Sequence, residues 1–82
     1  MTEKYSRKKI EEMRQDRVEL LRHLYPKGCR VRCDHMEDFQ AVPSGTLGTV
    51  DHVDDIGTIH VRWDTGSSLG LIYGEDEFTR IG

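Results

Sequence analysis

The fold of this chain is decided by GTLGTVDHVDDIGTIHVRWDTGSS, the stretch Gly45–Ser68. It contains two runs rich in β-branched residues, joined by the turn sequence Asp54–Gly57 and closed by a second turn sequence, Asp64–Gly66. β-Branched residues favour extended backbone, whereas Asp and Gly favour tight turns, so the stretch predicts two adjoining hairpins. One face of the second run is apolar and is expected to lie in the core: Ile59, Val61 and Trp63.

Turn signals recur along the rest of the chain and predict five short strands, over residues 29–34, 46–53, 58–64, 68–73 and 78–81. Strands this short and this frequent suit a small, strongly bent SH3-like barrel better than a two-sheet sandwich. The first residues differ, because apolar residues recur at helical spacing over residues 3–24 and Pro26 marks the end of that segment. The sequence therefore predicts a mainly β fold. An N-terminal amphipathic α-helix in residues 1–25 precedes a five-stranded SH3-like β-barrel in residues 26–82, and the two form one compact domain.

The predicted helix carries an apolar stripe with one charged residue, Arg17, inside it. The stripe consists of Ile10, Met13, Leu20, Leu21 and Leu24. Such a stripe is explained in either of two ways. It docks onto an open end or edge of the barrel, or it pairs with a second copy of the chain and produces a homo-oligomer.

Charge is divided unevenly between the two segments. Residues 1–27 contain eight Lys or Arg and five Asp or Glu, a net +3, while residues 28–82 contain four and ten, a net −6. A barrel of this charge repels a phosphate backbone, so nucleic-acid binding, if it occurs, is expected through the helix. The candidate contact residues are Arg7, Lys8, Lys9, Arg14 and Arg22. The structural alternative is a solvated helix face of mixed charge.

The cysteines and histidines predict neither a metal site nor a cofactor. On a strand, Cys29 and Cys33 share one face but stand about 13 Å apart, too far for a disulfide or a shared zinc ion, so both are expected in the core. His52 and His60 are expected to lie about 5 Å apart across a hairpin, as outward-facing polar partners. No apolar stretch approaches a bilayer span and the first residues lack the apolar core of a signal peptide, so a cytoplasmic protein without membrane contact is expected.

Acidic residues gather at the predicted turns, where Asp commonly bonds nearby backbone N–H groups. The sequence has no calcium-loop spacing, phosphate loop or nucleophile in a recognisable setting, so we expect no enzyme. We expect instead a non-catalytic module that binds a partner protein, for example through a basic segment. Phe39 is expected to be exposed in the loop over residues 36–45 and to share with Tyr73 a groove whose rim is formed by acidic residues. The predicted contact residues are Met36, Asp38, Phe39, Asp54, Asp55, Asp64 and Tyr73.

Several motifs in this chain together resemble a family of small bacterial, phage and mobile-element proteins, domain-of-unknown-function family 4314. They are PKGCRVRC, M-x-D over residues 36–38, PSGTLGTV, VDDIGTIHVRWDTGSSL and YGED. The resemblance runs from about Leu24 to Ile81; Cys29 and Cys33 depart from it, since other small or apolar residues are usual there. It implies a barrel, a mobile-element setting and no established activity. A looser resemblance, through Gly48-Thr49-Val50 and Val61–Gly66, is to SH3-like modules of eukaryotic ubiquitin ligases.

The mobile-element resemblance implies one further alternative, a phage-type counter-defence protein. Such a protein would inhibit a host immune protein or sequester a signalling nucleotide. Within the predicted barrel, three arginines are available to hold phosphates: Arg30, Arg32 and Arg62.

Overall fold

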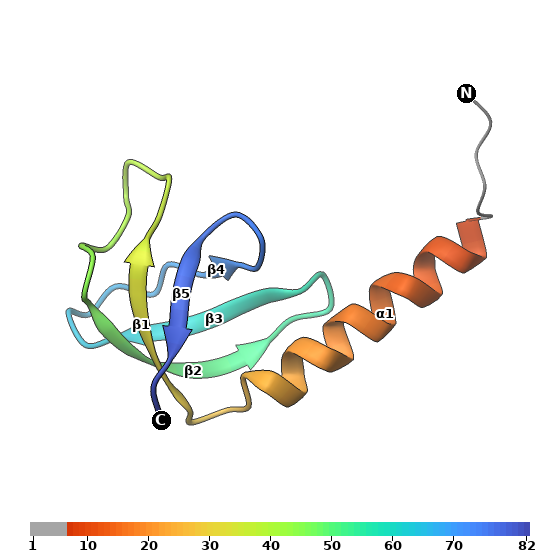
Figure 1. The fold of residues 1–82 in the computed structure, drawn as a ribbon, viewed down its shortest axis with the longest axis horizontal. Helices are drawn as coiled ribbons and strands as arrows, with labels where there is room; N and C mark the ends of the chain where they lie inside the picture. The colour runs from red at the N-terminus through yellow and green to blue at the C-terminus, as the bar shows by residue number, and fades with distance from the viewer. Residues whose placement is uncertain (1–6) are drawn as a thin grey trace.

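The protein consists of one N-terminal helix followed by a five-stranded antiparallel sheet (Figure 1). The computed structural model describes residues 7–82, and α1 spans Arg7–Leu24. The predicted helix end at Leu24 is confirmed, whereas the predicted start at residue 3 lies outside the described residues. The strands are β1 (Arg30–His35), β2 (Leu47–Val53), β3 (Thr58–Trp63), β4 (Leu71–Ile72) and β5 (Glu77–Arg80).

The strands follow the order β4-β3-β2-β1-β5, and every ladder is antiparallel. Within residues 7–82, the ladders leave β4 and β5 as the two edges, so the sheet is not closed by backbone pairing. Register shifts between Val50 and His52 and between Cys33 and His35 bend the strands locally. As a result, β1 and β5 cross β2 and β3 steeply and the sheet curves around its apolar face (Figure 1).

The fourth strand is much shorter than predicted. Residues 68–73 were expected to be extended, but only Leu71–Ile72 pairs with β3. The preceding residues instead form a loop over Trp63, whose backbone N–H donates to the Ser67 carbonyl and whose indole N–H donates to the Leu69 carbonyl at 2.8 Å. The buried indole therefore satisfies its only donor through this loop, at the expense of strand pairing.

The inward face of the sheet forms the core, and the alternation of the β3 residues predicts it correctly. Ile59, Val61 and Trp63 are buried, as are Cys29 and Cys33. Both cysteines are free thiols, and burial raises the pKa of each. The predictions of a core tryptophan and of two core cysteines are confirmed.

Helix α1 docks on its own sheet, one of the two predicted alternatives, but through a face that shares only Leu21 with the predicted stripe among the side chains described. Val18 and Leu21 are buried against the turn between β2 and β3, close to Gly57. Beside them, the Arg22 guanidinium donates to the Val53 carbonyl at 3.1 Å and to the Asp55 carboxylate at 2.9 Å. Three members of the predicted stripe remain exposed: Met13, Leu20 and Leu24.

The first half of α1 extends away from the sheet (Figure 1). Among the described residues, no helix is long and apolar enough to cross a membrane.

Candidate functional site

The predicted contact residues do not form one surface. Asp54 and Asp55 follow β2, whereas Asp64 follows β3, and because the two strands are antiparallel these positions lie at opposite ends of the hairpin. Phe39 occupies a third place, in the long loop between β1 and β2 (Figure 1). The residues therefore have to be considered separately.

Asp54 organises the turn between β2 and β3, as predicted for a turn former. Its carboxylate accepts hydrogen bonds from the backbone N–H groups of Ile56 and Thr58 and lies 2.8 Å from the imidazole Nε2 of His60. Burial acts to raise the pKa of Asp54, but the hydrogen bonds from His60 and the two backbone groups outweigh it and leave the pKa lowered. The Asp54 carboxylate is thus already hydrogen-bonded within the protein.

The two histidines of this hairpin pair as predicted. His52 lies opposite His60 in the β2–β3 ladder, and their rings stack with centroids 4.4 Å apart. His52 Nδ1 also lies 2.6 Å from a carboxylate oxygen of Asp51. Across the part of the chain that the structure describes, no group of three or more His, Cys, Asp or Glu side chains is placed to hold a metal ion.

Asp64 forms a bidentate ion pair with Arg30 on the sheet surface. Arg30 donates to both of its carboxylate oxygens, at 2.8 and 2.6 Å, and also to the Thr49 hydroxyl. This hydrogen bonding raises the pKa of Arg30 and lowers that of Asp64. Asp64 and Arg30 are therefore already paired with each other.

The other two arginines that were proposed to hold phosphates, Arg32 and Arg62, differ in their contacts. Arg32 donates to the Asp34 carboxylate at 2.7 Å and to the Thr79 hydroxyl. Arg62 is exposed and stands 4.0 Å from a carboxylate oxygen of Asp51. Arg30 and Arg32 therefore each donate a short hydrogen bond to a carboxylate, and only Arg62 of the proposed phosphate-holding set is limited to a longer carboxylate contact.

The loop between β1 and β2 contains one confirmed prediction and one wrong one. Phe39 is 97% exposed, as predicted. Met36 was expected at the contact surface but is only 7% exposed and belongs to the core. The register shift between Cys33 and His35 moves the inward position from residue 35 to residue 36, and no feature of the sequence marks that shift.

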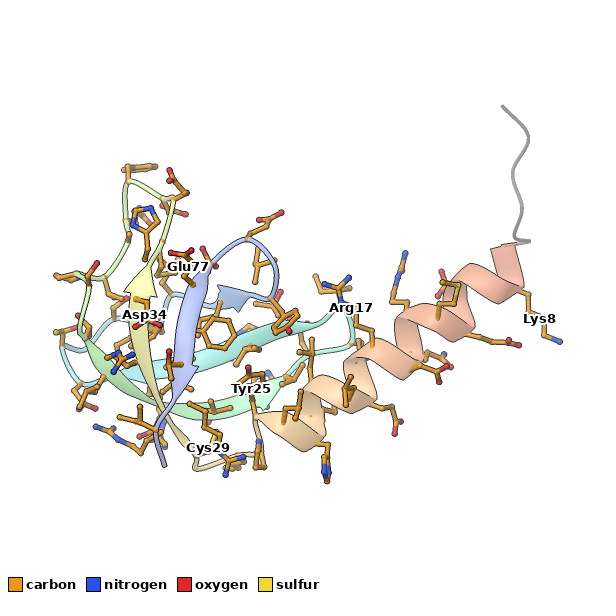
Figure 2. All side chains as sticks on the ribbon, viewed as in Figure 1. Lys8, Arg17, Tyr25, Cys29, Asp34 and Glu77 are labelled. Carbon is orange, nitrogen blue, oxygen red and sulfur yellow. The ribbon has the colours of Figure 1, made fainter. Side chains whose placement is uncertain are left out.

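Of the basic contact residues predicted on α1, the three whose side chains are described, Lys8, Arg14 and Arg22, lie apart along the helix. Lys8 is exposed near the start of the helix, far from the sheet (Figure 2). Arg14 lies 3.5 Å from Glu11 on the same helix, and Arg22 is engaged at the junction with the sheet. The side chains of Arg7 and Lys9 lie outside the described residues.

A groove of about 720 Å³ lies where β1, β5 and the turn before β5 meet the end of α1. We call it the acidic–aromatic groove, because three aromatic rings and five carboxylates line it together with His35 and Gly74. Its rings are Tyr25, Tyr73 and Phe78, and its carboxylates are Asp34, Glu37, Glu75, Asp76 and Glu77. Figure 2 shows Asp34 and Glu77 near each other on β1 and β5, with Tyr25 where α1 joins the sheet.

Phe78 contacts both of the other rings of the groove. The centroids of Tyr25 and Phe78 lie 5.2 Å apart, and Tyr73 approaches Phe78 edge-on at 6.3 Å. Burial beside these rings raises the pKa of the Tyr25 hydroxyl. The predicted association of Tyr73 with an acidic rim is therefore found, but its aromatic partner is Phe78 rather than Phe39.

The carboxylates of the groove differ in how far they are already paired. Hydrogen bonds from Thr79 and then Arg32 lower the pKa of Asp34, and Asp76 accepts the backbone N–H of Ile72. In contrast, the side chains of Glu75 and Glu77 make no hydrogen bond or ion pair with any described residue and are free to meet a ligand.

His35 lies in the groove 2.9 Å from the Glu37 carboxylate, and this hydrogen bond raises the pKa of the imidazole. In an NMR titration, we expect the His35 ring to titrate above the ordinary value of about 6.5. Because the folded-state pKa is raised, the pair stabilises the fold at low pH, and this contribution is lost as the pH rises through the folded-state value. A Glu37→Gln variant should return the midpoint towards the ordinary value; an unchanged midpoint would assign the shift to other carboxylates.

Of the ten residues that line this groove, only Tyr73 was among the predicted contact residues, and both of its aromatic neighbours, Tyr25 and Phe78, were missed. Tyr25 was assigned to the helix end and Phe78 to a strand, and 53 residues separate them along the chain. Only the pairing of β1 with β5 brings them together. The one visible signal was the acidic sequence Glu75–Glu77 directly before Phe78.

Comparison with known proteins agrees with the motifs of the sheet. No curated protein matches the chain. One family model matches residues 14–81, which include most of α1 and all five strands. The chain therefore belongs to the family described as Domain of unknown function (DUF4314).

Proposed function

We propose that this protein is a non-catalytic binding module that takes a basic segment of a partner protein in the acidic–aromatic groove. The observation that carries the proposal is the placement of three rings beside five carboxylates, of which Glu75 and Glu77 are unpaired within the described chain. Aromatic faces attract cations, and carboxylates pair with Lys and Arg, so both features favour the same ligand. The net −6 of residues 28–82 adds long-range attraction for a basic partner.

An internal contact of the protein supports this chemistry. The guanidinium carbon of Arg17 lies 5.9 Å from the centroid of the Tyr73 ring. Tyr73 therefore already accepts a cation on its side facing α1, and we propose that a ligand cation uses the neighbouring groove in the same way.

We further propose that the curved sheet is an SH3-like barrel, closed by side chains rather than by backbone pairing. The contact of Tyr73, just after β4, with Phe78 on β5 supports this, because it joins the two edge strands. We also propose the bacterial or mobile-element setting that the resemblance of the sequence implies, and the family match supports that resemblance. The two buried free thiols favour a reducing cytoplasm.

The contacts of the arginines favour this function over the two alternatives. Arg22 is already hydrogen-bonded to the sheet, so it is not available to bind nucleic acid through α1. The carboxylates of the acidic–aromatic groove would also repel a phosphate backbone. Arg30 and Arg32 already donate hydrogen bonds to carboxylates of the protein, which disfavours their use in binding the phosphates of a nucleotide. The inhibition of a host immune protein remains compatible, because it is itself a form of protein binding.

The experiment is a titration with a fluorescent peptide of alternating lysine and serine, followed by anisotropy. We expect binding that weakens with salt, and a loss of about tenfold in affinity for the Glu75→Gln/Glu77→Gln variant. The matched control is Glu12→Gln/Glu19→Gln, which makes the same change in net charge on the exposed surface of α1. Equal weakening by both variants would show that net charge, rather than the groove, attracts the peptide. A single-stranded oligonucleotide that binds the wild type more tightly than the peptide would overturn the proposal.

A further inference from the structure

Half of the large apolar side chains that are exposed in the described chain gather at one place. Of eight such residues, four line a second groove of about 490 Å³, between α1 and the β3–β4 side of the sheet. We call it the helix–sheet groove, and the four residues are Met13, Ile56, Ile72 and Tyr73. An apolar concentration of this kind on a small domain is typical of an interaction site.

The charges of the helix–sheet groove are mostly positive. Arg14 and Arg17 line it from α1, whereas Glu75 is its only acidic residue. Arg17 is positioned by the sheet, since its guanidinium donates to the Tyr73 carbonyl at 3.4 Å (Figure 2). The groove therefore suits a segment that combines a large apolar side chain with carboxylates, the opposite of what suits the acidic–aromatic groove.

The chain itself contains such a segment, at the tip of the loop between β1 and β2. Phe39, the most exposed large apolar residue, directly follows Glu37 and Asp38, and both carboxylates are exposed. The tip is held in shape, because the Asp38 carboxylate accepts the Gln40 N–H at 2.8 Å and the Asp38 carbonyl accepts the Ala41 N–H. On either side, Met36 and Val42 anchor the loop in the core. A tip ordered in this way loses little entropy on binding.

We propose that the Glu37–Phe39 tip of one copy inserts into the helix–sheet groove of a second copy. Phe39 would cover the apolar walls. Arg14 and Arg17 would meet the carboxylate oxygens of Glu37 and Asp38 that do not already contact His35 and the Gln40 N–H. Within one molecule the tip and α1 lie on opposite sides of the sheet (Figure 1), and the full exposure of Phe39 shows that it does not reach its own groove.

This pairing joins two different surfaces, so each molecule carries one free tip and one free groove. Such a heterologous contact extends into chains unless its rotation closes a ring. A single loop tip buries little area, so the association is weak and appears with rising concentration. The inference goes beyond the proposed function and uses the other groove, which shares only Tyr73 and Glu75 with the acidic–aromatic groove.

The experiment is sedimentation velocity over a concentration series, with variants that remove one surface each. Wild-type protein is expected to show a sedimentation coefficient that rises with concentration. Phe39→Ser removes the apolar side chain of the tip, and Arg17→Glu replaces a positive charge of the groove with a negative one. Each variant alone is therefore expected to stay monomeric. An equimolar mixture of the two restores a dimer and nothing larger, because the mixture contains one intact tip and one intact groove per pair.

Two further variants make the outcome decisive. Ile81→Ser removes another exposed apolar side chain, away from both surfaces, and should associate like the wild type. Circular dichroism checks that Arg17→Glu keeps the helicity of α1. If it does not, Met13→Glu provides a second variant that alters the helix–sheet groove. A wild type that stays monomeric throughout, variants that still associate, or a mixture that stays monomeric would each overturn the proposal. Peptide binding is measured on Phe39→Ser and Met13→Glu, whose side chains do not line the acidic–aromatic groove, and is expected to persist, which separates this result from the proposed function.

Discussion

Alanine at Gly48 is expected to destabilise the protein more than any other single methyl group added to the sheet. A Cβ atom at this position would stand 2.5 Å from Val61 Cγ1 and 2.7 Å from Trp63 Cε3. Both neighbours are buried side chains on the facing strand, so neither has space to withdraw. Overpacking of this severity costs about 3 kcal/mol or more, a large part of the stability of a small domain.

Urea unfolding monitored by Trp63, the single tryptophan, measures the loss directly. Gly45→Ala is the matched control, because Gly45 has a φ of 90° but nothing within 4 Å of the added atom. That variant is strained in its backbone alone and should lose about 1–2 kcal/mol. If both variants lost equal stability, close packing of β2 against β3 would not be the reason for glycine at position 48.

The hairpin of β2 and β3 shows how far local sequence determines this fold. Its turn residues, its inward face and the pairing of His52 with His60 all follow from neighbouring residues, and all were predicted correctly. The same local rules placed Cys29 and Cys33 in the core. These features depend on alternation along one strand or on one tight turn, which are visible in the sequence.

Features that depend on distant residues were missed. Met36 is buried because of a register shift that arises only when β1 pairs with β5. Strand β4 contains only Leu71 and Ile72 because the residues before it form a loop over Trp63. The acidic–aromatic groove joins Tyr25 to Phe78, and no local pattern links positions so far apart. In each case the deciding contact is tertiary.

The docking face of α1 was mispredicted for a related reason. The predicted stripe was centred near Arg17, and it contained Leu21 but not Val18. The observed face is rotated towards Val18 and Arg22, since Arg22 donates to the Val53 carbonyl and to Asp55. More than one face of α1 is apolar enough to dock, and the hydrogen bonds of Arg22 to the turn between β2 and β3 decide which face does. The helical periodicity of the sequence carries no information about those hydrogen bonds.

Leu21 lies at the centre of this docking face, and the Leu21→Asp variant is expected to release α1 from the sheet. Leu21 is 4% exposed, so the variant removes a buried leucine and places a charge in its position. Together these changes disfavour docking by about 3 kcal/mol or more. An undocked helix of 18 residues is only marginally stable in water, so most of its helicity is expected to be lost.

The control is Leu20→Asp, the same substitution one residue earlier, where the side chain is 56% exposed. Amide hydrogen exchange distinguishes the two variants. In Leu21→Asp the amides of α1 should lose protection while those of β2 and β3 keep theirs, whereas Leu20→Asp should resemble the wild type. Equal protection of α1 in both variants would mean that Val18 and Arg22 hold the helix without Leu21.

The two grooves are expected to respond differently to this release. The helix–sheet groove requires Met13, Arg14 and Arg17 from α1, so Leu21→Asp should abolish self-association along with docking. The acidic–aromatic groove takes only Tyr25 from this end of the chain, and Tyr25 is held separately by its contact with Phe78. Binding of the lysine–serine peptide should therefore survive in the same variant. Loss of both activities together would instead indicate that α1 supports the whole sheet, and the two grooves could not then be treated as independent sites.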